Sequence, residues 1–462
     1  MYVRPITDAL SPEQAAARLR RRPGFVWLDG QGIGEGEEGG EGRRSFMGCE
    51  PIARHTSPFE EPLEAALEAL SRLAEDRDRD PPMHGLRPSQ IPAWIGYLGY
   101  DAIFSGAPAR GRLDRSGAGP IAWFGRYDAL LCWDEAGGCA LVGDDAAACA
   151  RLEARLALEP PRPARPRVGV LEVESAGGHR EAIERALEHI AAGDIYQVNL
   201  ARRWRCPYEG EALPLWLAMR RASPVPLGFY LDAGDHVLLA RTMERFLRWE
   251  REEASGAGID RGWLWTRPIK GTIARSGEDD AGEARRLIGD AKERAEHSMI
   301  VDLMRNDLGR VARIGSVEVV DRLSVEPYAG LSHLVSTVRC QTRAGTTLAQ
   351  ILEATFPPGS VTGAPKIRAM QIIEALERSP RGVYTGCVGY LDRLGGASFA
   401  VAIRTAQLRE QTLCYHAGGG LVEASDPDRE LEETELKARV LRDALEALRE
   451  GGGANEPDEG RS

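Results

Sequence analysis

Two expected helices carry carboxylates in line with their apolar residues. In the C-terminal helix, the apolar stripe extends at helical spacing to Lys437 and Glu433. In a helix around 287–309, Glu296 lies one turn before the stripe and Glu293 one turn further back. Burying a carboxylate is unfavourable unless a cation or hydrogen-bond donors accompany it. Carboxylates without a Cys or His cluster suit Mg²⁺, although solvated helix-surface charges give the same spacing.

Arg404 lies in a run with strand-like alternation, SFAVAIRTAQL. A single strand over 398–408 would place Arg404 on the same face as Ala400 and Ala402. These small side chains leave room for a guanidinium group to bind a carboxylate through two hydrogen bonds. An arginine at the margin of a sheet would have the same pattern.

Lys270 and Glu244 each close an apolar run. Lys270 ends the Trp-bearing run GWLWTRPIK, and a lysine in apolar surroundings loses its proton more readily and can become a nucleophile. Glu244 follows VLLA and is a candidate general acid or base if it is buried. The alternative for Lys270 is a surface lysine before a turn.

Two glycine-containing loops are candidate anion sites. The run HAGGGLV places Gly418, Gly419 and Gly420 at the end of a strand-like run, where exposed amides can form an anion nest. In GSVTGAPKIRAM, a loop leads into a helix with Pro365 in its first turn. A bulge explains the first pattern equally well, and helix capping explains the second.

These residues are carried by alternating helices and strands. The mixture of runs such as GFVWLDG and PLEAALEALSRLAED predicts an α+β fold in the N-terminal part, and 386–422 is expected to form a meander. The Pro-rich stretch at 158–168 separates an N-terminal region, 1–155, from a catalytic region, 172–448. The Gly-rich end, 451–462, is expected to be a flexible tail.

The composition argues against several classes of protein. The chain has 462 residues, with 59 Lys or Arg and 70 Asp or Glu, so its net charge is −11. Nucleic-acid binding requires a basic surface, which this balance disfavours. The eight cysteines are scattered, so neither a zinc site nor a disulfide framework is indicated. Because there is no signal peptide or long apolar run, we expect a cytoplasmic protein with no membrane contact.

Several motifs in this order resemble the chorismate-utilising enzymes. They are PIKGT, KERAEHSMIVDLMRNDLGRV, HLVSTV, FPPGSVTGAPKIRAM, YTGCVGY, FAVAIRT, AGGGLV and EETELK. The family includes anthranilate synthase component I, aminodeoxychorismate synthase component I, and the isochorismate and salicylate synthases. The resemblance covers nearly all of 178–445, and N-terminally it rests on RRSFMGCEP and WIGYLGYD. It implies an anthranilate-synthase-type fold, a central antiparallel β-sandwich surrounded by helices.

The resemblance also implies roles for the acidic residues. By match to the family's motifs, Glu296 and Glu433 are the expected Mg²⁺ ligands. Glu293 and Glu430 are expected nearby, as outer or water-mediated contacts. The ion would bridge to the carboxylate on the ring of chorismate.

The remaining expected site residues would bind or transform the substrate. The ring carboxylate would also contact Lys437 and the amides of Gly418, Gly419 and Gly420. The enolpyruvyl carboxylate would be held by Arg404 and Tyr384. Lys270 is expected as the nucleophile and Glu244 as the acid, and the pocket would be lined by Thr362, His333 and Gln197.

Two positions distinguish branches of the family. Isochorismate and salicylate synthases have a general-base lysine where this chain has Gln197, so that branch is disfavoured. Anthranilate synthases typically have PIAGT, whereas Lys270 points to the aminodeoxychorismate synthase branch, and Asn199 agrees with this. The expected product is 4-amino-4-deoxychorismate, the precursor of 4-aminobenzoate and folate.

The resemblance further implies a partner. Amination enzymes of this family take ammonia from a glutamine amidotransferase subunit, and no glutaminase motif is found in this chain. We therefore expect a separate partner subunit. The alternatives are anthranilate synthase component I, for tryptophan biosynthesis, and an inactive regulatory relative.

Overall fold

The computed structural model describes most of the chain. The described residues are 1–7, 10–30, 44–75, 88–106, 113–115, 119–162, 164–174, 177–252, 261–274, 280–328 and 331–450. The expected tail at 451–462 lies outside the described residues, as does most of a Gly/Glu-rich loop at 30–44.

The larger of two sheets has thirteen strands among the described residues. Along its main path the strands are β1 (Tyr2–Ile6), β8 (Cys139–Gly143), β7 (Ala129–Trp133), β3 (Ser45–Gly48), β2 (Val26–Asp29), β12 (Leu227–Asp232), β13 (His236–Thr242), β22 (Thr405–Arg409), β23 (Thr412–Leu421), β11 (Gln197–Glu209) and β10 (Glu172–Val173). Two short strands also pair with β11, namely β9 (Arg167–Val168) and β19 (Gly363–Ala364).

The smaller sheet has ten strands in the described part of the chain. In order they are β16 (Ile269–Ala274), β18 (Leu331–Gln341), β15 (Gly262–Arg267), β14 (Arg245–Arg251), β21 (Ala397–Val401), β20 (Cys387–Asp392), β5 (Pro92–Leu98), β6 (Ala122–Arg126) and β4 (Ala53–Ser57), with β17 (Glu318–Tyr328) paired to β18.

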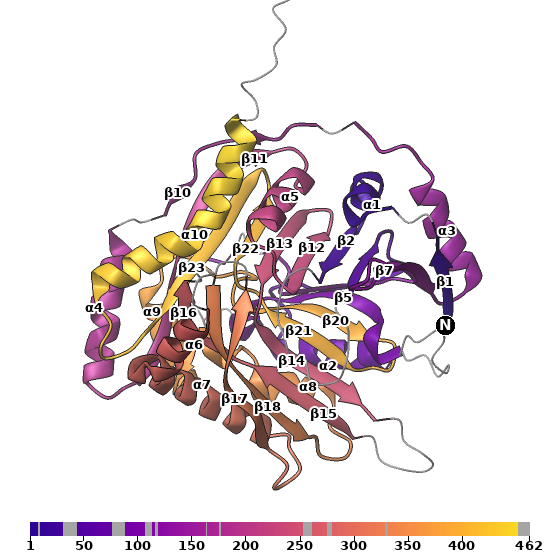
Figure 1. Ribbon diagram of the computed structural model, residues 1–462. Helices are drawn as coiled ribbons and strands as arrows, with labels where there is room; N and C mark the ends of the chain where they lie inside the picture. Colours follow the sequence, from indigo (N-terminus) through magenta and orange to yellow (C-terminus); the bar gives the residue numbers. More distant parts are fainter. Residues whose placement is uncertain are drawn as a thin grey trace, which may run out of the picture.

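Helices surround the two sheets (Figure 1). They are α1 (Pro12–Leu19), α2 (Leu63–Ala74), α3 (Ala146–Leu156), α4 (Gly178–Ala191), α5 (Leu213–Ala222), α6 (Asp280–Gly289), α7 (Ala291–Gly309), α8 (Leu348–Thr355), α9 (Lys366–Leu376) and α10 (Pro427–Glu450), with 3₁₀ turns η1 (Pro88–Gln90), η2 (Tyr100–Phe104) and η3 (Gly359–Val361). The helix expected around 287–309 begins at Ala291, because α6 is a separate helix that ends at Gly289. Within the described residues, no helix combines the length and apolarity needed to cross a membrane.

The sheets pack face to face because alternate residues of their strands are apolar. Between them, Leu28, Phe46 and Phe229 of the larger sheet share a buried cluster with Ile95 and Val388 of the smaller sheet. Helices α1, α3, α5 and α10 share a second cluster with strands of the larger sheet, and α2, α7 and α8 share a third with strands of the smaller sheet. The expected α+β fold with a central antiparallel sandwich is confirmed.

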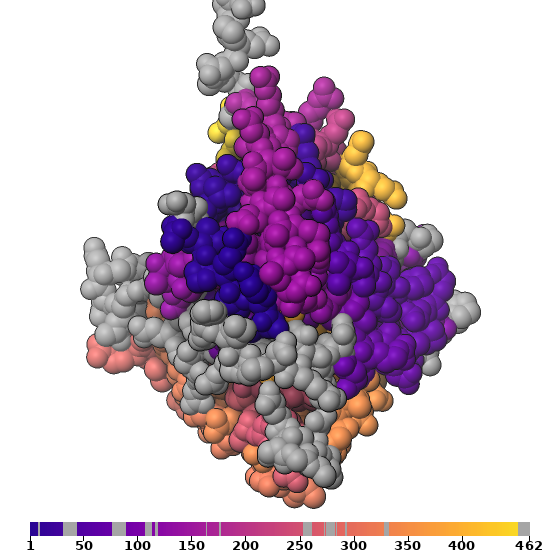
Figure 2. Space-filling view, turned by 90° about the vertical axis from the view of Figure 1, so that its right-hand side faces the viewer, coloured from indigo at the N-terminus to yellow at the C-terminus, as the bar shows by residue number. Residues whose placement is uncertain are grey.

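Both sheets contain strands from either side of the Pro-rich stretch. In the larger sheet, β2 pairs with β12, and in the smaller sheet β5 pairs with β20. The segment that joins α3 to β10 runs along one edge of the molecule (Figure 1). N-terminal residues form much of the face shown in Figure 2, with residues of the C-terminal region below them. The regions 1–155 and 172–448 therefore share one sandwich.

The single strand expected over 398–408 is wrong. The chain forms β21 in the smaller sheet, crosses between the sheets, and continues as β22 in the larger one. Arg404 lies in this crossing with a φ of 49°, so it does not share a strand face with Ala400 and Ala402. β21 is mostly apolar and buried, and β22 begins with the buried residues Thr405 and Ala406, so the alternation continued through the crossing without indicating it. Two hairpins, β20–β21 and β22–β23, replace the meander.

Candidate active site

Lys270 extends from the smaller sheet towards the larger one. It lies on β16, and its Nζ is 2.9 Å from the position that a Cβ atom on Gly420 of β23 would occupy. The Nε2 atom of Gln197 is 2.8 Å from the same position. Only a glycine leaves room here for both side chains, so the structure brings the expected nucleophile to the glycine strand.

Glu244 is buried beside Lys270, where β13 gives way to β14. Its side chain is 6% exposed, and the Ser360 hydroxyl donates a hydrogen bond of 2.5 Å to its Oε1. The backbone of Ile269, which precedes Lys270, also hydrogen-bonds to this carboxylate. Burial raises the pKa of Glu244 to about 7, although the Ser360 hydrogen bond and the charge of Lys270 oppose this shift. The carboxyl can therefore hold a proton near neutral pH.

Arg404 supplies a half-buried positive charge at the crossing between the sheets. Burial lowers the pKa of its guanidinium, and among the residues that the structure describes no carboxylate is paired with it. His333, on β18, hydrogen-bonds to the carbonyl oxygen of Gly271 over 3.1 Å. Burial, followed by the charge of Arg404, lowers the pKa of His333 to about 4, so this imidazole is neutral. A carboxylate ligand would compensate the charge of Arg404.

The three glycines form a strand, not the expected nest. Gly418, Gly419 and Gly420 pair in β23 with residues 199–201 of β11. The amides of Asn199 and Ala201 bond away from β23, so the register turns the peptide groups of Gly418 and Gly420 away from β11. On that side β22 pairs only as far as Tyr415. The glycines thus continue the strand-like run to its end, and their missing side chains make space.

Helix α10 places three charged residues against this strand. Lys437 donates to the Gly418 carbonyl over 2.8 Å, and its Nζ is 2.6 Å from Oε1 of Glu433. Glu430 Oε2 lies 2.6 Å from the Cβ position of Gly419, and Glu433 Oε1 lies 4.0 Å from it. Glu433, expected to continue the inward stripe, has a side chain 46% exposed, whereas Glu430 is buried.

Helix α7 brings a second pair of carboxylates. Glu293 Oε2 is 3.2 Å from the Cβ position of Gly271, next to Lys270, and Glu296 lies one turn further along the helix. Both side chains are half-buried. Carboxylates of α7 and α10 thus reach the strands β16 and β23 that meet at Lys270, and oxygen donors of this kind fit a hard divalent cation. No ready-made cluster of three or more acidic, His or Cys ligands occurs in the described part of the chain.

Three further expected residues line the same region. Tyr384 is 4% exposed and stacks on His416 with ring centroids 5.2 Å apart. Thr362 is fully buried, and its hydroxyl bonds within its own loop, to Pro358 and Gly359, so it shapes the loop. The amide of Gln197 is also fully buried, and neither of its polar atoms has a hydrogen-bond partner within the described residues. Such an amide beside Lys270 is available for a polar ligand.

Two residues in contact with this site were not predicted. Ser360 hydrogen-bonds to Glu244, and Arg381 contacts Val361, Thr385 and Asn199, which are neighbours of expected site residues. Ser360 lies two residues before Thr362 in the loop motif, but its spacing to Glu244 in sequence carries no signal.

The larger of two described cavities lies elsewhere, between the sheets, and none of the expected site residues lines it.

Known proteins resemble the chain over most of its length. A model of the chorismate binding enzyme family matches residues 37–443. Anthranilate synthase component 1 of Aquifex aeolicus is 41% identical over 272 residues, which are 58% of this chain and 53% of the relative. Aminodeoxychorismate synthase of Streptomyces griseus is 38% identical over 392 residues, 79% of this chain and 53% of the relative. The chain thus spans about half the length of the curated relatives it matches.

A solved structure shares the fold. Anthranilate synthase component I from Streptococcus pneumoniae TIGR4 superposes with a TM-score of 0.73 at 27% identity, covering 94% of this chain and 98% of that one. Because the family model matches well over half of the sequence and the sandwich is shared with a solved relative, the chain belongs to the family of chorismate binding enzymes.

Proposed function

We propose that this chain is an aminodeoxychorismate synthase component I, which converts chorismate and ammonia to 4-amino-4-deoxychorismate. One observation carries the proposal. Lys270 Nζ lies 2.9 Å from the Cβ position of Gly420, beside the buried amide of Gln197. It is also near the buried carboxyl of Glu244, whose pKa is about 7. A nucleophile and a proton donor are therefore close together in a site that also holds Arg404, a cation with no carboxylate partner among the described residues.

Substrate binding follows from the charges around Lys270. Arg404 and Tyr384 would bind the enolpyruvyl carboxylate, and Lys437 with the amides of Gly418 and Gly420 would face the ring carboxylate. Glu296 and Glu433 would hold Mg²⁺ with support from Glu293 and Glu430, and the ion would neutralise the ring carboxylate.

The chemistry divides one substitution into two steps. The Nζ atom of Lys270 attacks ring carbon 2, the two ring double bonds shift from carbons 1–2 and 5–6 to carbons 1–6 and 4–5, and the bond from carbon 4 to oxygen breaks. Glu244 gives its proton to the departing hydroxyl, which leaves as water. Ammonia then adds at carbon 4, both double bonds shift back, and the bond between carbon 2 and Lys270 breaks, while the proton that the ammonia loses returns to Glu244. The enolpyruvyl group is retained throughout.

A glutamine amidotransferase subunit would supply the ammonia. The name of the Streptococcus pneumoniae relative, component I, supports a multi-component enzyme. Anthranilate synthase component I remains the second candidate, because the Aquifex aeolicus relative of that name has 41% identity.

One incubation tests the proposal. The purified chain is mixed with chorismate, Mg²⁺ and ammonium, and products are separated by chromatography with and without an aminodeoxychorismate lyase. We expect a product that the lyase converts to 4-aminobenzoate. Lys270→Ala should lower the rate by at least about a hundredfold, because the first bond cannot form.

The other outcomes separate the alternatives. Fluorescent anthranilate as the main product would identify the second candidate instead. If an amidotransferase subunit and glutamine are supplied and chorismate is still not consumed, the regulatory alternative is favoured. An unchanged rate and product for Lys270→Ala would remove the covalent step.

A further inference from the structure

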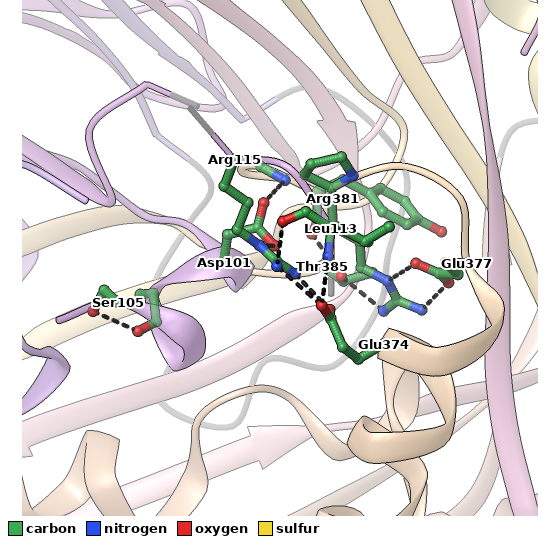
Figure 3. A network of polar contacts seen from close by, with 12 residues as sticks. Asp101, Ser105, Leu113, Arg115, Glu374, Glu377, Arg381 and Thr385 are labelled. Atoms are coloured by element: carbon green, nitrogen blue, oxygen red, sulfur yellow. Dashed lines mark hydrogen bonds and ion pairs between the residues drawn. The ribbon is translucent and has the colours of Figure 1, made fainter. Parts of the chain in front are cut away.

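A buried arginine outside the expected site contacts three segments of the pocket (Figure 3). Arg381 is 1% exposed, and each of its five guanidinium N–H groups has an acceptor. Two N–H groups bind the carboxylate of Glu377, at 2.9 and 2.6 Å. The other three reach the Val361 carbonyl at 3.0 Å, the Thr385 hydroxyl at 3.0 Å and the Asn199 carbonyl at 2.7 Å.

The pair of Arg381 and Glu377 continues the hydrogen bonding of β11 beyond the end of β19. The Asn199 amide bonds to the Thr362 carbonyl over 2.8 Å, and the Asn199 carbonyl accepts from Arg381. Two residues along, the Ala201 amide donates to Glu377 over 2.8 Å. Side chains therefore satisfy an edge of β11 that, within the described part of the chain, has no neighbouring strand at this point.

The same guanidinium group supports the turn that carries Tyr384. Its central carbon is 5.8 Å from the centroid of the Tyr384 ring. Thr385, which accepts from Arg381, also bonds through its amide to the Ala402 carbonyl over 2.8 Å. Ala402 lies two residues before Arg404, so the contacts of Arg381 extend to the crossing between the sheets.

A neighbouring ion-pair group anchors this region to the N-terminal part. Asp101, in η2, accepts from the Gly382 amide over 2.7 Å and pairs with Arg115 at 3.2 Å. Arg115 in turn binds both carboxylate oxygens of Glu374 on α9, at 3.1 and 2.6 Å. Figure 3 shows these residues next to Arg381 and Glu377. The backbone next to Arg381 is thus tied, through Gly382, to η2 and α9.

We propose that Arg381 is a positioning residue for the substrate pocket. Its planar group fixes β11, the loop at 361–362 and the turn at 384–385 relative to one another. The inference rests on the proposed function, because these segments carry Gln197, Thr362 and Tyr384. A lysine cannot reproduce five donors in one plane, so Arg381→Lys should loosen all three segments together.

The test compares Arg381→Lys with Arg393→Lys. Arg393 is also 1% exposed, but it lies in the turn between β20 and β21 and pairs with Asp144. For both variants and the parent chain we would measure the melting temperature, kcat and KM for chorismate. Hydrogen exchange would be followed in peptides covering 196–201, 359–364 and 383–387.

Arg381→Lys should raise the KM for chorismate at least about tenfold and speed exchange in all three peptides. Arg393→Lys should melt at a lowered temperature but keep the parent KM and exchange in these peptides. A merely structural role would lower the folded fraction, so that kcat falls at constant KM, and this result would overturn the inference.

Failure of the proposed function has a different signature. If the parent chain makes anthranilate, the proposed function is wrong. The role of Arg381 is then tested by comparing the KM for chorismate of Arg381→Lys and of the parent chain in the anthranilate reaction. If the parent chain consumes no chorismate, the exchange rates decide it. If hydrogen exchange in the three peptides of Arg381→Lys is no faster than in those of Arg393→Lys, the positioning role is overturned.

Discussion

At neighbouring positions the fold buries the ionisable side chain of Glu244 and half-buries that of Arg404. The Glu244 carbonyl accepts a hydrogen bond from the Val401 amide, immediately before the chain crosses between the sheets, and Arg404 lies within that crossing. Burial favours the neutral form of both groups, because it raises the pKa of Glu244 and lowers that of Arg404. For Glu244 the raised pKa of about 7 places the titration near neutral pH. Each group therefore has an unfavourable solvation energy that a substrate can relieve.

The raised pKa of Glu244 predicts how activity and stability change with pH. The folded carboxyl binds its proton up to about pH 7, whereas its ordinary pKa is 4.5. Its contribution to the free energy of unfolding is complete below about pH 4.5 and is lost as the pH rises through about 7, a change of at most about 3 kcal/mol. As the acid, the protonated form should also make kcat fall above about pH 7. Denaturant unfolding and kcat across this range test both.

Glu244→Gln should lower kcat by about 10²- to 10⁴-fold and reduce the loss of stability between pH 4.5 and 7. Asp392→Asn is a matched control, because burial also raises the pKa of Asp392 to about 7. That residue accepts the amides of Leu394 and Gly396 in a distant turn. The Asp392→Asn substitution should change the free energy of unfolding without altering the pH profile of kcat. A wild-type kcat that stays constant above about pH 7 would contradict the assignment.

At the scale of elements, two glycines of β23 allow effects on stability and effects on activity to be tested separately. A Cβ atom on Gly420 would lie 2.8 Å from Gln197 Nε2 and 2.9 Å from Lys270 Nζ, which are ends of flexible side chains. A Cβ atom on Gly418 would lie 2.4 Å from the main-chain oxygen of Leu200. Gly420→Ala should therefore cost less than about 1 kcal/mol of stability yet lower kcat/KM at least about tenfold.

Gly418→Ala on the same strand should instead cost about 1–3 kcal/mol, because main-chain atoms must shift. Denaturant unfolding and chorismate kinetics on both variants distinguish the two effects. If Gly420→Ala keeps the parent kcat/KM, then the contact between Lys270 and β23 is not part of the reacting geometry.

The sequence indicated elements with long periodic patterns better than the places where they meet. The stripes of two helices led to Lys437 and Glu293, and both now lie against the strands that carry Gly418 and Lys270. The crossing at Arg404 was missed because the period-2 alternation of β21 continues into β22, although the two strands belong to different sheets. Arg381 was missed because its acceptors include main-chain carbonyls far away in sequence, and such partners leave no pattern.

At the scale of the whole molecule, net charge and local charge are separate properties. The excess of eleven acidic residues argues against a nucleic-acid partner. The net charge does not determine the local charge of the candidate site, where Arg404 has no carboxylate partner among the residues described by the structure. A dianionic substrate is thus compatible with an acidic chain, because buried local charges are screened less than surface ones.

The shared sheets predict that the chain stays assembled after cleavage in the Pro-rich stretch. Residues 158–160 are exposed, and a protease site inserted there would cut between α3 and β9. The fragments would remain joined by two antiparallel pairs, β2 with β12 and β5 with β20, and by the apolar cluster between the sheets. We expect them to co-elute in gel filtration, to melt in one transition and to keep the parent activity. Fragments that separate under native conditions, with activity in the C-terminal one, would show that 172–448 folds alone and that the N-terminal strands are dispensable.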